Sequence, residues 1–350
     1  EYPVLSISSA CDGALPIKGR DKIKTGIVIL IVLGLVGGVA TTLGLGVPLV
    51  SAMIATLFEV EDSMLIKISV LAFWTALFGT SVYKGLKAGI KILADINVVL
   101  AIFAILFVLI AGPGVFILDL TVNSFGLMFS NFMSTATWTD PIREGDFPEA
   151  WTGFYWAWWF AYTGMVGLFF GRISRGRTIR QLVLGVITWG CIGTWLFLAV
   201  MGGYSLFLEK TGALAVTEIL NSQGMSFLNA LVIKSLPFGK ITLAIFTVLS
   251  IIFYATTIDS SAYVISSICA KDLENTQEPR RWNRITWAVL LALITAGLLQ
   301  ADSLQTTLSM TVVSSLPMIP ILILLCISIR KWLEEDFAHL NLNKEIVKTK

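Results

Sequence analysis

Long runs of apolar residues divide this sequence and limit what it can fold into. A helix that crosses a lipid bilayer needs about 20 apolar residues. Eight runs qualify or nearly do: 25–51, 64–82, 94–118, 153–170, 182–204, 240–264, 285–299 and 306–329. Charged residues make up only 14% of the chain, whereas an ordinary soluble domain has about a quarter. We therefore expect an all-α polytopic membrane protein with about eight transmembrane helices.

The basic residues predict how these helices are oriented. If residues 1–24 are cytoplasmic, the segments on that side of the membrane carry 20 of the 25 lysines and arginines. Such a bias marks the cytoplasmic side, so we place the chain in the inner (cytoplasmic) membrane with both ends inside. The expected divisions are a cytoplasmic segment (1–24), a transmembrane domain (25–329), an extracytoplasmic loop with a surface helix (119–150) and a cytoplasmic tail (330–350).

The stretch WTGFYWAWWFAYT, residues 151–163, concentrates aromatic rings inside one of the apolar runs. Helical spacing puts five of them on one face: Trp151, Tyr155, Trp158, Trp159 and Tyr162. An interfacial belt of Trp and Tyr is shallow, whereas this face extends roughly 16 Å along a helix. Two interpretations remain, a buried packing face and a cage that holds a quaternary ammonium ion against ring faces.

Other kinds of function find less support. The only histidine is His339, and the four cysteines are scattered without a metal-binding spacing, so we expect no cofactor and no membrane-embedded enzyme. The GxxxxGK[ST] motif of ATP-binding loops is absent from the sequence, so nothing in it indicates ATP-driven transport. The arginines of 172–180 are typical of a cytoplasmic loop that touches anionic lipid, and we expect no nucleic-acid partner.

Several segments resemble the betaine/choline/carnitine transporter (BCCT) family. The most specific is FYWAWWFAYTGMVGLFFGRISRGRTIR, residues 154–180, and GGVATTLGLGVPLV (37–50), TDPIREGDFPEAWT (139–152) and TTIDSSAYVIS (256–266) follow the family's order. The resemblance implies a LeuT-like core of two inverted repeats. Residues 25–118 would supply first-repeat helices and 153–329 the second repeat. It also implies that the chain corresponds to the last eight of twelve helices, with the N-terminal ones missing.

The resemblance assigns roles to the aromatic run. Trp158, Trp159 and Tyr162 would line the central substrate site, and Trp151, Phe154 and Tyr155 would lie nearer the outer entrance. Family members often have tryptophan where Tyr162 stands, while tyrosine is also seen in carnitine and butyrobetaine carriers. The exact substrate therefore stays open.

Polar residues at membrane depth suggest how transport is coupled. The resemblance implies a sodium site with side-chain ligands Thr256 and Thr257 and the carbonyl of Phe253. Asp259 is an intramembrane carboxylate and a candidate for coupling or gating, although it could simply bond nearby polar groups. Sodium-independent family members carry arginine where this chain has Asn97, which favours cation coupling here.

A second sodium site of the family uses threonines on the helix at 25–51. The alignment places Leu35 and Val39 there, with Thr41 and Thr42 close by. One sodium site is therefore plausible and a second is doubtful.

These observations predict a secondary active transporter of small quaternary-ammonium solutes, working by alternating access and coupled to sodium. The family's common assembly also suggests a homotrimer. The alternatives are a proton-coupled or exchange transporter of a related solute, such as a sulfonium compound or an amino acid, and a channel or sensor that does not transport.

Overall fold

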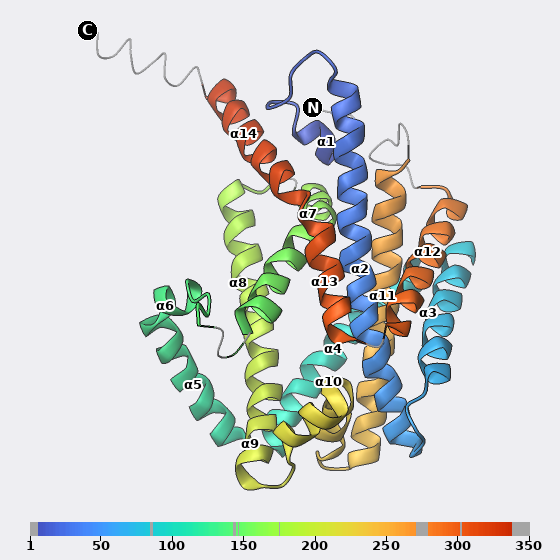
Figure 1. Ribbon diagram of the computed structural model, residues 1–350, viewed down its shortest axis with the longest axis vertical. Coiled ribbons are helices and arrows are strands. Elements are labelled where there is room, and N and C mark those ends of the chain that lie inside the picture. The colour runs from blue at the N-terminus through green and yellow to red at the C-terminus, as the bar shows by residue number, and fades with distance from the viewer. Residues whose placement is uncertain are drawn as a thin grey trace.

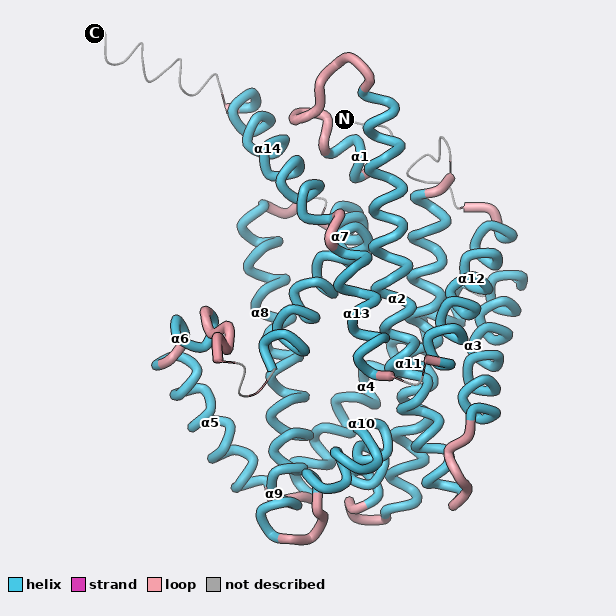
Figure 2. Tube along the Cα trace, in the orientation of Figure 1, coloured by secondary structure: helices cyan, strands magenta, loops and turns pink. Residues whose placement is uncertain are grey.

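The computed structural model describes residues 6–84, 87–142, 145, 147–174, 176–270, 279–301 and 303–337. Within these ranges the chain is built from helices and contains no strand (Figure 1). Figure 2 shows that mostly short loops join the helices. The expected all-α architecture is therefore confirmed.

Fourteen α-helices and two π-helical turns follow one another along the described residues. The first part of the chain forms α1 (Ile7–Ala10), α2 (Arg20–Phe58), α3 (Met64–Lys84), α4 (Lys87–Ala111), α5 (Gly114–Ser130) and α6 (Phe132–Ala136). The second part forms η1 (Pro148–Thr152), α7 (Gly153–Ile173), α8 (Ile179–Phe197), η2 (Leu198–Gly202), α9 (Gly203–Thr211), α10 (Val216–Lys234), α11 (Gly239–Ile268), α12 (Arg281–Gln300), α13 (Leu304–Ser315) and α14 (Met318–Asp336).

Seven helical stretches of the described chain are long and apolar enough to cross a membrane. Helix α7, which contains the aromatic run, corresponds to the one expected span that is not among these seven, and it has a suitable length of 21 residues. It falls outside the seven because tryptophan and tyrosine are amphipathic and lower its mean hydropathy. The seven spans are those of a multi-pass membrane protein.

Two of the predicted helix limits differ from the structure for the same reason. The run 94–118 divides into α4 and α5 at Pro113, and the run 306–329 divides into α13 and α14 at Pro317. Proline has no backbone N–H to continue the helical hydrogen bonds. The apolar pattern continues across both prolines, so hydropathy alone could not locate the breaks.

Helix α2 is the central element of the molecule and packs against α7, α10, α11, α12 and α13 (Figure 1). One cluster of buried side chains joins α2 to α3, α11 and α12, with Trp74 and Leu43 fully enclosed. A second cluster joins α4, α9, α10 and α11 around Val108 and Leu243. The long central helix therefore ties the two clusters together.

Helix α8 lies apart from these clusters on one flank of the molecule (Figure 1). Its apolar side chains point outward, and Trp189 is 75% exposed. A helix that is apolar all round is stable in hydrocarbon or inside protein rather than in water. This outer surface is therefore suited to lipid or to further helices.

The surface helix expected within the loop 119–150 corresponds to the last part of α5 and to α6. Its position in the plane of a membrane stays a prediction.

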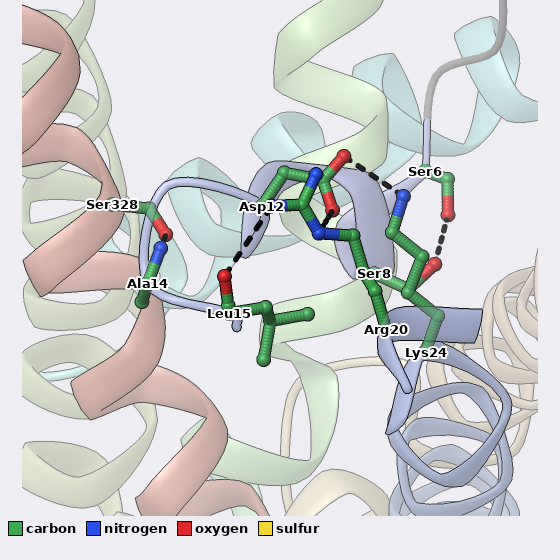
Figure 3. Close-up of polar contacts among 8 residues, drawn as sticks. All are labelled: Ser6, Ser8, Asp12, Ala14, Leu15, Arg20, Lys24 and Ser328. Carbon is green, nitrogen blue, oxygen red and sulfur yellow. Dashed lines mark hydrogen bonds and ion pairs between the residues drawn. The ribbon is translucent and has the colours of Figure 1, made fainter. Parts of the chain in front are cut away.

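The N-terminal residues that precede α2 pack against the middle of α14 (Figure 3). The amide N–H of Ala14 donates to the hydroxyl of Ser328 at 3.0 Å. Gly13 allows this approach, because a Cβ there would lie 3.0 Å from the Cα of Ser328. The start of the described chain and the end of α14 thus lie at the same end of the molecule (Figure 1).

Asp12 holds this N-terminal segment, residues 6–19, onto the first turns of α2. Its carboxylate accepts a hydrogen bond from Lys24 Nζ at 2.8 Å and lies 4.0 Å from Arg20 Nε (Figure 3). Arg20 also donates to the carbonyl of Leu15 at 3.3 Å. The neighbouring Cys11 is completely buried.

The buried thiol of Cys11 should report whether this segment is docked. Burial first, and then the charge of Asp12, raise the pKa of Cys11 from 9.0 to about 11, although Lys24 opposes the shift. The thiolate is the reactive form, so its fraction at neutral pH falls about 100-fold. We expect slow maleimide labelling that accelerates about tenfold per pH unit up to pH ~11.

The measurement uses protein in which Cys191, Cys269 and Cys326 are replaced by serine. Denaturation in detergent should restore an ordinary labelling rate. Asp12→Asn should raise the rate in the folded protein, because it weakens the ion pairs that hold the segment. Rapid labelling of folded Cys11 at pH 7 would contradict the docked arrangement.

Candidate functional site

Five aromatic side chains form a continuous series along α7 and its preceding turn, and we call them the aromatic ladder: Trp151, Phe154, Tyr155, Trp158 and Tyr162. Trp151 lies 6.2 Å from Tyr155, measured between ring centroids, and Tyr155 lies 6.1 Å from Trp158. Phe154 stacks on Trp158 at 5.5 Å with an interplanar angle of 20°. Each ring thus restrains its neighbour, and their faces lie within the distance at which aromatic rings interact.

Helical periodicity explains why these residues meet. Positions 151, 155, 158 and 162 are separated by three or four residues and fall on one side of a helix. The π-helical turn η1 carries Trp151 and continues directly into α7. Phe154 is almost fully buried, so the ladder has a packed side as well as an open one.

The structure separates Trp159 from the ladder. Its ring is 68% exposed and makes no ring contact within the described part of the chain. One residue beyond Trp158 corresponds to a rotation of about 100° around the helix, which turns the indole aside. Trp156 likewise lies off the ladder, against Phe160 at 5.9 Å. A role of Trp159 in binding therefore stays a prediction.

Tyr162 ends the ladder and connects it to the central helix α2. Its ring meets the indole of Trp158 edge-on, with centroids 6.0 Å apart. Its hydroxyl lies 2.8 Å from the hydroxyl of Thr42. A Cβ at Gly38 would lie 3.1 Å from the tyrosine ring, so only glycine leaves comfortable room for it. Sequence analysis placed Thr42 near a possible ion site but missed its contact with Tyr162.

The three predicted sodium ligands lie together on α11. The hydroxyls of Thr256 and Thr257 both donate to the carbonyl of Phe253, at 2.8 and 3.1 Å. Three oxygens are therefore clustered on one turn of helix. Threonine commonly makes such bonds within a helix, so the contact alone fits both a structural role and a set of oxygen ligands. The ring of Phe253 is itself exposed.

Asp259, one turn of helix beyond the threonines, has a partner that sequence analysis missed. Arg284 Nη2 on α12 lies 3.0 Å from Asp259 Oδ1, and both side chains are largely buried. The guanidinium also lies over the ring of Tyr263 at 5.2 Å. Asp259 lies in the second half of α11 and Arg284 near the start of α12. Their sequence positions alone do not show that the two side chains meet, because this depends on how α11 and α12 pack together.

Asn97, the other predicted coupling residue, is a buried amide on α4. Its side chain is 7% exposed, and its Oδ1 atom has no hydrogen-bond partner among the described residues. Among the described residues, no hydrogen bond joins it to the aromatic ladder or to the threonines of α11. Of the arginines predicted to touch lipid, Arg177 and Arg180 are exposed, while Arg175 and the side chain of Arg172 lie outside the described residues.

The sequence is similar to that of known membrane transporters. The model of the betaine/carnitine/choline family transporters matches residues 2–338. A carnitine transporter of Acinetobacter baumannii is 30% identical over 335 residues, which are 95% of this chain and 61% of that protein. The high-affinity choline transport protein of Escherichia coli K12 is 32% identical over 317 residues, 90% of this chain and 46% of its own length.

A third relative, the glycine betaine transporter OpuD of Bacillus subtilis strain 168, is 29% identical over 333 residues, 94% of this chain and 64% of its own length. The chain thus spans less than two thirds of each of these three relatives. The match to the family model nevertheless covers nearly all of its 350 residues. The chain therefore belongs to the BCCT family of betaine, carnitine and choline transporters.

Proposed function

We propose that this chain forms the substrate-binding part of a secondary active transporter for small quaternary-ammonium solutes. The observation that carries the proposal is the aromatic ladder, in which Trp158 stacks on Phe154 and meets Tyr162 edge-on. The carnitine, choline and glycine betaine transporters among its relatives support the same class of substrate.

The chemistry of the substrate matches that of the ladder. A methylated nitrogen carries a positive charge but has no N–H to donate, so ordinary hydrogen bonds cannot hold it. The faces of tryptophan and tyrosine carry negative electrostatic potential and attract such a cation within about 6 Å of the ring centre. Each contact contributes about 0.5–2 kcal/mol, and more when water is excluded.

Transport proceeds, in this proposal, by alternating access with sodium as the coupling ion. The cluster of Thr256, Thr257 and the Phe253 carbonyl supplies oxygen atoms, which hard cations prefer. Asp259 is a weaker candidate for a proton relay, because its carboxylate already faces the charge of Arg284 at 3.0 Å. The proposal also includes an inner-membrane location with both ends cytoplasmic, contact with anionic lipid and assembly as a homotrimer.

Removing one hydroxyl should weaken sodium coupling. With Thr257→Ala in the complete gene product, we expect the sodium concentration for half-maximal uptake to rise about tenfold, as for the loss of one oxygen ligand worth about 1.4 kcal/mol. The measurement is uptake of labelled choline, carnitine and glycine betaine at varied sodium concentrations. Unlabelled sulfonium compounds and amino acids serve as competitors and test the alternative substrates.

Thr286→Ala is the matched control. Thr286 makes the same kind of bond, 2.9 Å to the carbonyl of Trp282, but lies exposed on α12. We expect its sodium curve to match that of the unaltered protein. If the sodium curve of Thr257→Ala also overlays that of the unaltered protein, sodium does not bind at this site. Uptake driven by a proton gradient alone would favour the proton-coupled alternative.

A further inference from the structure

The N-terminal segment, residues 6–19, is anchored at two places by polar contacts (Figure 3). The amide N–H of Ala14 donates to the hydroxyl of Ser328 on α14 at 3.0 Å, and Ser328 is fully buried. The carboxylate of Asp12 accepts from Lys24 on α2 at 2.8 Å. Hydrogen bonds fix both the distance and the direction of a contact. The segment therefore ties the start of α2 to α14.

Helix α7 meets the N-terminal segment differently, through aliphatic side chains at a glycine. A Cβ at Gly164 would lie 3.1 Å from Cδ1 of Ile7 in the segment and 2.8 Å from Cγ2 of Ile31 on α2. The backbone of α7 thus lies directly on these two side chains. Apolar contacts are non-directional, so this one permits α7 to slide or tilt past the segment.

Beside this contact, the N-terminal segment, α7 and α14 surround a partly open cavity of about 380 Å³. Its lining includes two residues from each element: Ile7 and Ala10 of the segment, Gly167 and Leu168 of α7, and Leu325 and Trp332 of α14. Protein interiors normally pack with few voids larger than a water molecule, which needs only about 10–15 Å³. A Cβ at Gly167 would have no atom within 4 Å. The second half of α7 is therefore not packed against side chains on this side.

Movement of α7 into this cavity would carry the aromatic ladder with it. Tyr162 lies only about 7.5 Å before Gly167 along the same helix, at 1.5 Å per residue. The hydroxyl of Thr42, 2.8 Å from that of Tyr162, belongs to α2, which the N-terminal segment holds to α14. A shift of α7 therefore moves the ladder relative to α2, and alternating access requires a relative movement of this kind.

We propose that the N-terminal segment holds α2 and α14 together as one body, and that the cavity beside it is the space into which the second half of α7 moves during transport. This inference rests on the proposed function and specifies which helices move. Water or lipid in such a cavity can be displaced, whereas packed side chains resist displacement. A large side chain placed in the cavity should therefore block the movement and leave the ladder intact.

Variants at Gly167 test the role of the cavity. Gly167→Phe places a ring in it, and we expect the maximal rate of labelled choline uptake by the complete gene product to fall about tenfold. The choline concentration for half-maximal uptake should change by less than about twofold, because the binding residues are unaltered. Gly167→Ala leaves most of the cavity open and should transport normally, which separates the need for space from the flexibility of glycine.

Gly297→Phe is the matched control. Gly297, on α12, also has no atom within 4 Å of a Cβ, and it is exposed, so we expect its uptake to match that of the unaltered protein. Normal uptake by folded Gly167→Phe would overturn the proposal. If no onium compound enters by the unaltered protein, the proposed function itself fails, which is a distinguishable result.

Distances between pairs of spin labels test the movement itself and do not depend on whether Gly167→Phe folds. Labels replace three exposed side chains: Ile17 in the N-terminal segment, Phe169 on α7 and Arg330 on α14. When sodium and choline are added to the complete gene product, we expect the distance from 17 to 330 to stay constant and that from 17 to 169 to change by roughly 2–5 Å. The proposal is overturned if both distances stay constant or if both change by that amount.

Discussion

Replacing Trp158 by alanine should raise the apparent substrate constant about 30-fold while the protein still folds. Trp158 is the central ring of the ladder and contacts Phe154, Tyr155 and Tyr162. Losing a cation–π contact of about 2 kcal/mol in a site without water accounts for this factor. The measurement is concentration-dependent uptake, with the amount of folded protein in the membrane determined in parallel.

Trp156→Ala is the matched control for this prediction. Trp156 is on the same helix and is also a large indole, but it is exposed and packs against Phe160 away from the ladder. We expect its substrate constant to stay near that of the unaltered protein. Similar apparent substrate constants for Trp158→Ala and the unaltered protein would contradict a role of the ladder in substrate binding.

Replacing Arg284 by glutamine should destabilise the protein strongly. The change leaves the Asp259 carboxylate without the partner that lies 3.0 Å away, and both side chains are largely buried. Removing one member of a buried ion pair costs about 3–5 kcal/mol, because the remaining charge is unpaired. We expect a marked loss of folded protein and a lower melting temperature in detergent.

The double variant Asp259→Asn with Arg284→Gln separates charge from packing. It leaves no isolated charge, and replacement of both partners is often close to neutral, so most of the stability should return. Recovery would assign the ion pair a structural role. If the double variant is stable but sodium dependence changes, Asp259 takes part in coupling as well. Full stability of Arg284→Gln alone would contradict the importance of the pair.

The sequence predicted the helices well because most of their apolar runs are close to or above the roughly 20 residues that a bilayer-spanning helix needs. It predicted their ends less well, since the hydropathy signal passes through Pro113 and Pro317, where the backbone breaks. The resemblance to the family was confirmed by the match over residues 2–338. The proposed inverted repeat and the numbering of missing helices stay predictions.

The site was predicted in part, for a physical reason. Spacing alone was enough to place Trp151, Tyr155, Trp158 and Tyr162 on one face, because they are on a single helix. Spacing did not show that Trp159 lies off the ladder. Nearly every neighbour on α7 is apolar or aromatic, so the pattern does not reveal which side of the helix faces the protein interior. The contacts of Tyr162 with Thr42 depend on how two helices pack, and one sequence does not reveal that.

Counterflow in liposomes tests the central claim most directly, that a caged onium ion is carried across the membrane by this protein. Liposomes that contain the complete gene product and a high internal concentration of unlabelled choline are diluted into labelled choline. The account predicts transient accumulation of label above equilibrium, because a carrier exchanges bound substrate, and it predicts that Trp158→Ala largely abolishes this at low substrate concentration. Passive equilibration without overshoot, or no entry of choline, carnitine or glycine betaine, would contradict the account.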